Sequence, residues 1–296
     1  MRIHLSALDL LCLFLTMGPI VYAGPIQSLR FSETIVCLGT ESTDPDQNNS
    51  RCNAGLSLGT NNASGDFGLG SAFLSGSSLA DSSVGSFRVG VDATWGIAGT
   101  RGRAFSEATA GLLDIVTIDF SGLSGRIGYS RLLYSISGLV SNSGDSTSAI
   151  RVIIRTNSPA AQARGFNNPN PYVRFYEHSV PHTIESVGYF PFVYGQPFSV
   201  EFLLTAVTGT VGTNGNPNAY VRGAGAGYAN FLNTATIEAF EVFDEDLTPV
   251  TGATISSDAG LFTPEGSSVG YCLIGAIFLC CLRYRGNGAI AGYPPT

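Results

Sequence analysis

The segment 177–185 (EHSVPHTIE) holds the densest group of chemically active side chains in the chain. It places His178 and His182 between Glu177 and Glu185, a composition that suits a metal site or an acid–base pair. On a strand, a separation of four residues would put the two histidines about 13 Å apart, and Pro181 disfavours a regular helix. We therefore favour an ordinary turn between strands, with His178 and His182 kept as candidate metal ligands.

A second group of possible metal ligands is Asp44-x-Asp46-x-Asn48, which is similar to the opening of a calcium loop. An EF-hand is excluded, because Asn49 occupies the position that needs glycine and Gly55 the position that needs a bidentate glutamate. Two interpretations remain, a looser site of oxygen ligands and a solvated turn rich in Asp and Asn.

Aromatic side chains give a third candidate chemistry, the contact with sugar rings. Trp95 is the only tryptophan of the chain, and Tyr172 and Tyr176 belong to a group of aromatic residues that includes Phe175 and Tyr189. Large flat rings with a polar atom suit glycan surfaces. The alternative is that these rings are core residues and cross-strand pairs.

Charged residues exclude several mechanisms. All 15 basic residues are arginine, so mechanisms that need a Schiff-base lysine, a P-loop lysine or a Ser-Lys dyad are excluded. We expect that the protein is not an enzyme and binds no cofactor. The formal net charge of −7 argues against nucleic acid as a partner.

The positions of the six cysteines bear on whether the central part of the chain works in an oxidising compartment. Cys12 lies near the N-terminus and three others lie in an apolar run near the C-terminus, which leaves Cys37 and Cys52 between them. In an oxidising compartment these two can form a disulfide, and two free buried thiols are the alternative.

The central part of the chain has the periodicity of strands. Apolar residues alternate with others in 150–155 and in 198–207, and clusters of Gly, Asn, Asp, Pro and Ser separate the segments. We expect an all-β fold, an antiparallel β-sandwich of jelly-roll type. Further strands are expected at 29–38, 84–93, 113–120, 127–140, 172–177, 184–190, 234–243 and 250–256, with a bulge near Ala239 and turns at 212–218 and 223–227. Residues 53–78 are expected to form a long loop or an edge region, in which 67–74 could hold a weak strand.

The two termini predict export and membrane attachment. Residues 1–23 have a basic start, an apolar stretch and a Val21-Tyr22-Ala23 end, as a signal peptide does. Residues 269–282 are apolar and end at Arg283 and Arg285. Fourteen residues rise roughly 21 Å as a helix, short of a bilayer core of about 30 Å, so the interpretation as a single transmembrane helix needs snorkelling arginines. A buried core segment is the alternative.

The C-terminal quarter resembles bacterial exported proteins with a PEP-CTERM sorting signal. The passage 228–260 (YANFLNTATIEAFEVFDEDLTPVTGATISSDAG) is similar to the segment that precedes such signals, and 196–207 (QPFSVEFLLTAV) to the strand upstream of it. Pro264 and Glu265 match the central pair of the motif, and Arg283 and Arg285 match the basic cluster. Gly266 stands where the family has a second proline, and residues 286–296 extend beyond the cluster.

This resemblance implies a substrate of exosortase, a membrane enzyme of bacteria that make exopolysaccharide. It divides the chain into a signal peptide (1–23), a β-sandwich body (24–262), a sorting signal (263–285) and a short tail (286–296). We expect export, tethering to the inner membrane during sorting, and a final place at the cell surface or outside it. The expected function is a non-enzymatic envelope or matrix protein that is structural, adhesive or glycan-contacting, and the alternative is a secreted carbohydrate-active enzyme.

Overall fold

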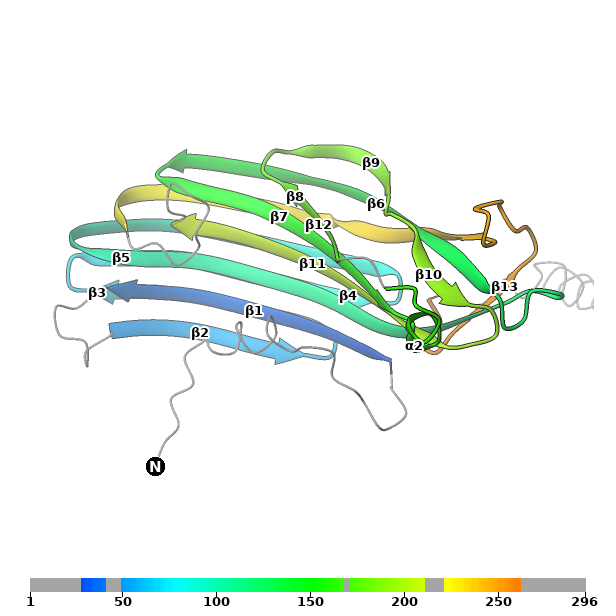
Figure 1. The fold of residues 1–296 in the computed structure, drawn as a ribbon. Helices are drawn as coiled ribbons and strands as arrows, with labels where there is room; N and C mark the ends of the chain where they lie inside the picture. Colours follow the sequence, from blue (N-terminus) through cyan, green and yellow to red (C-terminus); the bar gives the residue numbers. More distant parts are fainter. Residues whose placement is uncertain (1–27, 41–48, 168–170, 211–220, 262–296) are drawn as a thin grey trace, which may run out of the picture.

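The computed structural model describes residues 28–40, 49–167, 171–210 and 221–261 (Figure 1). The expected signal peptide, the Asp44-Asp46-Asn48 group, the turn at 212–218 and the sorting signal with its apolar run lie outside these residues. Within the described ranges, no helix has the length and the apolar character needed to cross a membrane.

The described body is all-β and has two layers that share one long strand. Strand β5 (Ser86–Asp119) is 34 residues long. Its first half pairs with β4 (Ala72–Ser83) and β12 (Val221–Phe243). Its second half pairs with β1 (Leu29–Thr40) and β11 (Phe198–Thr210). The strand therefore leaves one layer and enters the other, and every described strand pair is antiparallel.

The remaining strands extend the two layers outward from β5. In the first layer β3 (Thr60–Leu69) flanks β4, β6 (Ile127–Gly144) flanks β12, and β9 (Val180–Ser186) and β10 (Phe190–Val193) follow the other edge of β6. In the second layer β2 (Asn49–Ser57) flanks β1, β7 (Ser146–Asn157) flanks β11, β8 (Tyr172–Tyr176) flanks β7, and β13 (Thr254–Ser257) pairs with the end of β5. A one-turn helix, α2 (Pro159–Gln162), follows β7.

The chain crosses repeatedly between the layers. From the second half of β5, in the second layer, the chain passes to β6 in the first layer and then back to β7 in the second. Later it passes from β11 in the second layer to β12 in the first. The late strands β11 and β12 thus lie between earlier ones, and the result is an elongated stack of long strands (Figure 1).

The main core lies between the layers, as the alternating pattern predicts. Phe202, Leu204 and Ala206 of β11 are buried, and Phe202 stacks on Phe87 of β5 with 4.5 Å between ring centroids. The cluster draws buried residues from both layers, which makes the body sandwich-like: among them are Ala80, Val89, Val91, Ala108, Ala110, Leu112, Leu132, Tyr134, Ile136, Ile150, Val152, Ile154, Ala229 and Phe231.

Two smaller clusters lie at opposite ends of the second half of β5. One cluster, which we call the Trp95 end, surrounds the point where the halves of β5 meet. Its buried residues include Val36, Leu38, Leu74, Trp95, Ile97 and Ala104. The other, which we call the Phe192 end, lies where β13 pairs with the last residues of β5. Its buried residues include Val116, Ile118, Phe192, Tyr194, Phe198 and Val242.

A disulfide joins Cys37 of β1 to Cys52 of β2. The two residues are direct cross-strand partners with Cα atoms 4.2 Å apart. Because β2 lies at the edge of its layer, the bond fastens an outer strand to the sheet at the Trp95 end.

For 53–78 the edge region is confirmed and the long loop is wrong, because these residues form most of β2, all of β3 and the first part of β4. Strands β2 and β3 end their layers and keep most side chains exposed. Such strands need few large apolar residues, so their composition resembles that of a loop.

The expected turn at 223–227 is also wrong, because it lies inside β12. A Cβ atom on Gly227 would lie 2.5 Å from the hydroxyl oxygens of Ser148 and Thr208, so glycine is needed there for close approach of the layers. By contrast, the bulge expected near Ala239 is confirmed by a register shift between Ile237 and Ala239.

Candidate functional site

Tyr172 and Tyr176 lie at the edge where the two layers meet. Both come from β8, and both approach Tyr134 of β6 in the other layer. The Tyr134 hydroxyl oxygen lies 2.9 Å from that of Tyr176 and 3.5 Å from that of Tyr172. Since β8 is an edge strand, these hydroxyls link two layers that no backbone ladder joins there.

Glu185 of β9 completes this group. The hydroxyls of Tyr172 and Tyr134 donate hydrogen bonds to Glu185 Oε2 at 3.1 and 3.3 Å, and Arg174 Nε lies 3.7 Å from the same oxygen. We call Tyr134, Tyr172, Arg174, Tyr176 and Glu185 the tyrosine cluster. It arises because alternate residues of β8 face the other layer.

Burial sets the protonation of this cluster. Loss of water raises the pKa of Tyr134, Tyr172 and Tyr176 above the ordinary tyrosine value, and the hydrogen bonds from its two tyrosine neighbours add to the effect for Tyr134. The three hydroxyls therefore stay protonated at neutral pH. They can donate and accept hydrogen bonds, but they offer no phenolate base.

Only part of the tyrosine cluster is open to a ligand. Tyr134 and Tyr176 are buried, whereas Tyr172 is half-buried and Arg174 is exposed. The neighbouring Phe175 is 59% exposed and lies on the outer face of β8. A ligand can thus reach Tyr172, Arg174 and Phe175 along one edge strand.

The two histidines lie close to this cluster in sequence but do not form a metal centre with it. His178 lies between β8 and β9, His182 lies in β9, and both are exposed. Among the described residues, no three side chains of His, Cys, Asp or Glu gather as a possible metal site. The candidates Asp44, Asp46 and Asn48 are outside the described residues.

Trp95 is a core residue, which corrects its place among the glycan-contact candidates. Its side chain is 1% exposed and packs within the Trp95 end. Trp95 lies on the inward face of β5, next to Thr94 and Gly96 on the outer face. A surface ligand cannot reach it in this structure.

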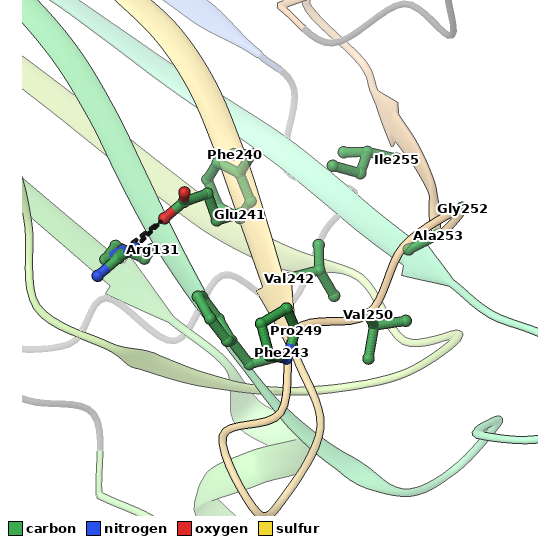
Figure 2. A pocket seen from close by; sticks show the side chains of 10 residues that line it. All are labelled: Arg131, Phe240, Glu241, Val242, Phe243, Pro249, Val250, Gly252, Ala253 and Ile255. Carbon is green, nitrogen blue, oxygen red and sulfur yellow. Dashed lines mark hydrogen bonds and ion pairs between the residues drawn. The ribbon is translucent and has the colours of Figure 1, made fainter.

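A groove lies at the opposite end of the body, beside the last residues of β12 (Figure 2). It has a volume of about 380 Å³. The lining comes from β6, β12, β13 and the loop between β12 and β13: Arg131, Phe240, Glu241, Val242, Phe243, Pro249, Val250, Gly252, Ala253 and Ile255. Part of this lining belongs to the segment 228–260 that resembles the lead-in of a sorting signal.

An ion pair borders the groove. Arg131 Nε and Nη2 each lie 2.5 Å from Glu241 Oε2, and the two residues are direct partners on β6 and β12. This hydrogen bond raises the pKa of Arg131. The guanidinium carbon lies 5.5 Å from the ring centroid of Tyr189 and 5.4 Å from that of Phe243. Cation–π attraction therefore fixes the guanidinium at the mouth of the groove.

The outer face of the second layer holds a carboxylate pair that the sequence did not indicate. Glu107 of β5 lies opposite Ile35, and Glu33 of β1 lies opposite Thr109, so the two glutamates are diagonal neighbours on one face. Burial raises the pKa of Glu33. Burial also raises the pKa of Glu107 to about 7, with a smaller opposing effect of Arg151 and a small further rise from Glu33.

No signal in the sequence could have paired these glutamates, since they are far apart along the chain. Alternation along β5 and β1 indicates only that each faces outward. Their proximity follows from the antiparallel register of the two strands.

Asp114 fastens the end of the described body. It is fully buried and accepts hydrogen bonds from Ser28 Oγ at 3.0 Å, Ser257 Oγ at 2.5 Å and Ala259 N at 2.8 Å. The carboxylate thus joins the first described residue of the body to the segment after β13. We assign it a structural role, because each of these partners belongs to the chain itself.

Comparisons of the chain with protein-family models, with curated proteins and with solved structures found no match.

Proposed function

We propose that this chain is an exported, tail-sorted protein of the cell envelope or extracellular matrix, and that its β body contacts glycan without enzymatic activity. The N-terminal residues 1–23 act as a signal peptide, and 269–282 form a single transmembrane helix. Pro264, Glu265 and the two arginines after the helix are the features an exosortase-type enzyme would recognise. The remaining partners are the bacterial membrane and exopolysaccharide.

The disulfide between Cys37 and Cys52 is the observation that carries the export proposal. Disulfides persist in oxidising compartments and are rare in the reducing cytosol. An outer strand fastened by such a bond suits a protein that works outside the cytoplasm.

The order of the strands supports a jelly roll as the type of sandwich. In a jelly roll, successive strands cross between two four-stranded antiparallel sheets, and late strands return to lie between early ones. Here the spatial order of strands in the first layer is the first half of β5, then β12, β6 and the edge strands β9 and β10. In the second layer it is the second half of β5, then β11, β7 and β8. Strands β1 to β4 extend this eight-strand arrangement at the side of β5.

The tyrosine cluster supports glycan contact. Tyr172 and Arg174 present hydroxyl and guanidinium groups at the edge, and Phe175 exposes its ring on the opposite face of β8. The hydroxyl and the guanidinium can hydrogen-bond to sugar hydroxyls, and the half-buried ring of Tyr172 can cover the apolar face of a sugar. Protonated tyrosines around Glu185 suit binding better than proton transfer.

Deletion of residues 264–296 tests the sorting part of the proposal. We expect the deleted protein to appear in the culture medium with its disulfide and fold intact, because the anchor is gone. Deletion of 286–296 alone is the matched control and should leave the protein on the cells. Retention of the 264–296 deletion in the membrane fraction would contradict the proposal.

A polysaccharide panel tests the glycan part. The purified full chain should bind at least one neutral polysaccharide, and Tyr172→Phe should weaken this binding by about threefold through loss of one hydrogen bond. Tyr228→Phe is the control, because Tyr228 is another partly exposed tyrosine and lies on β12, outside the cluster. Equal effects of the two substitutions would assign the loss to something other than the cluster.

The second candidate function is a secreted carbohydrate-active enzyme, and the glutamate pair favours it. Diagonal neighbours on an antiparallel ladder have backbone positions about 7–8 Å apart, so the two carboxylates come from neighbouring positions on one face, as the paired carboxylates of a glycosidase must. With its pKa of about 7, Glu107 could act as the acid. Glu107→Gln should abolish any hydrolysis of a bound glycan, and a glycan-binding chain that releases no reducing ends would rule this candidate out.

The same glutamate predicts a pH dependence of stability. Folded Glu107 keeps its proton up to about pH 7, whereas in the unfolded chain it loses the proton near its ordinary pKa of 4.5. The contribution of Glu107 is therefore fully present below pH 4.5 and is lost as the pH rises towards 7. Because the side chain keeps some contact with water, we expect a loss of about 1–2 kcal/mol. Urea unfolding at pH 5 and pH 8 should show this loss of stability in the wild type, and Glu107→Gln should not show it.

A further inference from the structure

We propose that the groove beside Arg131 and Glu241 binds a neutral sugar unit of a polysaccharide chain. This inference rests on the proposed glycan function and adds a site and a ligand class to it. The groove lies on the side of β12 that faces β13, whereas the tyrosine cluster lies across β6, at the edge that β8 and β9 form.

The lining of the groove has the two kinds of surface that a sugar ring needs. Apolar side chains occupy the part between β12 and β13, where the half-buried Val250 and Ile255 lie (Figure 2). The ion pair of Arg131 and Glu241 lies on the other side of β12, towards β6, and supplies the polar part of the lining (Figure 2). A pyranose ring has an apolar face of C–H groups and a rim of hydroxyls, and small-molecule sites combine apolar walls with a few placed polar groups in the same way.

The ion pair selects a neutral ligand. Arg131 and Glu241 compensate each other's charge at 2.5 Å, so the groove has no net charge of its own to attract an ion. The contact engages Glu241 Oε2, and the side chains remain 31% and 37% exposed. The second carboxylate oxygen can accept from a sugar hydroxyl, and the remaining guanidinium donors can bind a hydroxyl oxygen.

The position of the guanidinium is fixed before any ligand arrives. Its contacts with Tyr189 and Phe243 hold it on one side, and the two rings meet edge to face at 5.1 Å. Tyr189 is 39% exposed, so its ring borders solvent beside the ion pair. A preorganised polar group loses less entropy on binding, which favours affinity for a small ligand.

The loop that forms the other wall is also held in place. Asp244 Oδ1 accepts hydrogen bonds from the backbone N–H groups of Asp246 at 3.0 Å and Thr248 at 2.8 Å. Val250 N donates to Val242 O at 2.9 Å, which brings the loop back along β12. The wall is thus part of the folded body and needs no rearrangement to receive a ligand.

The size of the groove fits a short stretch of a sugar chain. Its volume of about 380 Å³ is near the lower end of small-molecule sites, and it is open to solvent on one side. An open groove allows a polysaccharide to enter with one unit while the rest of the chain continues along the surface. Tyr172 and Arg174 lie on the far side of β6, at the edge that β8 and β9 form, where the polysaccharide could meet them with another unit.

The test is calorimetric titration of the full chain with cellohexaose and maltohexaose as neutral probes and tetragalacturonate as an acidic one. The double substitution Arg131→Ala and Glu241→Ala removes the ion pair without leaving a lone charge, and we expect about tenfold weaker binding of a neutral probe. The matched control is Arg155→Ala with Glu201→Ala, a cross-strand ion pair at 3.0 Å that lies on the second layer. This control should change the affinity by less than about twofold.

A second variant protects the test against misfolding. Tyr189→Ala keeps the ion pair and removes an exposed ring, so it should fold and still weaken binding by about threefold. Unchanged affinity in both groove variants, with a loss in Tyr172→Phe, would overturn this inference and leave the proposed function standing. No binding of any sugar by the wild type would overturn both, and binding of tetragalacturonate alone would overturn the neutral ligand class.

Discussion

The two ends of the body use aromatic residues in different ways. At the Trp95 end the only tryptophan is buried among small and branched side chains, and a disulfide fastens the neighbouring outer strand. At the Phe192 end the aromatic side chains are more numerous, and the cluster there is bordered by the groove, the Arg131–Glu241 pair and the exposed ring of Tyr189.

This difference shows that position in the sheet, more than residue type, decides whether a ring is available to a ligand. Trp95 lies on the inward face of a central strand, so the layers cover it. Tyr189 lies between two edge strands, where no further strand covers it. We therefore assign a structural role to the Trp95 end and a binding role to the Phe192 end.

The largest expected effect comes from Trp95→Ala. Loss of a fully buried indole should reduce the free energy of unfolding by about 3–5 kcal/mol, because the cavity cannot close completely. Glycan affinity of the folded fraction should stay unchanged. Chemical denaturation and titration of the same sample measure both quantities, and Trp95→Phe is the milder control. A stable Trp95→Ala protein that no longer binds glycan would reverse the roles of the two ends.

Removal of the disulfide should have the next largest effect. Replacing Cys37 and Cys52 together by serine opens a loop of about 15 residues. The unfolded chain then gains conformational entropy, which should lower the free energy of unfolding by about 3 kcal/mol. We expect a lower urea midpoint and faster proteolysis in β2, measured by limited digestion and mass spectrometry. The groove should be unaffected, so a change in its affinity would mean that the two ends are coupled.

Tyr194→Phe should have the smallest effect, and at the opposite end. Burial, with a contribution from the charge of Asp244, raises the pKa of Tyr194 to about 12, so its hydroxyl stays protonated and donates to Phe243 O at 3.0 Å. Loss of this bond should cost about 1 kcal/mol of stability and loosen the backbone beside the groove. A thermal midpoint equal to that of the wild type would show that this bond does not support the groove.

Much of the fold was predictable from alternation. The strands at 29–38, 127–140, 172–177 and 198–207 correspond to β1, β6, β8 and β11, and the signal is clearest in β6 and β11, where a row of alternate apolar side chains is buried between the layers. The length of β5 was not predictable, since its two halves serve different layers and the Gly-rich stretch between them resembles a turn. The sequence left β2 and β3 between a long loop and an edge region, because edge strands lack a large apolar row.

The candidate site was predictable only in part. Tyr172 and Tyr176 were named from their type, but their partners Tyr134 and Glu185 come from strands whose pairing the sequence does not specify. Arg131 and Glu241 are partners only through the register of β6 and β12. A cross-strand pair has no local spacing that a single sequence reveals.

Hydrogen exchange of the full chain, with and without a saturating neutral polysaccharide, tests the division of roles most directly. We expect slower exchange in 240–255, around Arg131 and Tyr189, and in β8. Exchange around Val36, Leu74 and Trp95 should stay unchanged. Protection confined to the Trp95 end, or protection nowhere, would show that the Phe192 end does not bind the polysaccharide.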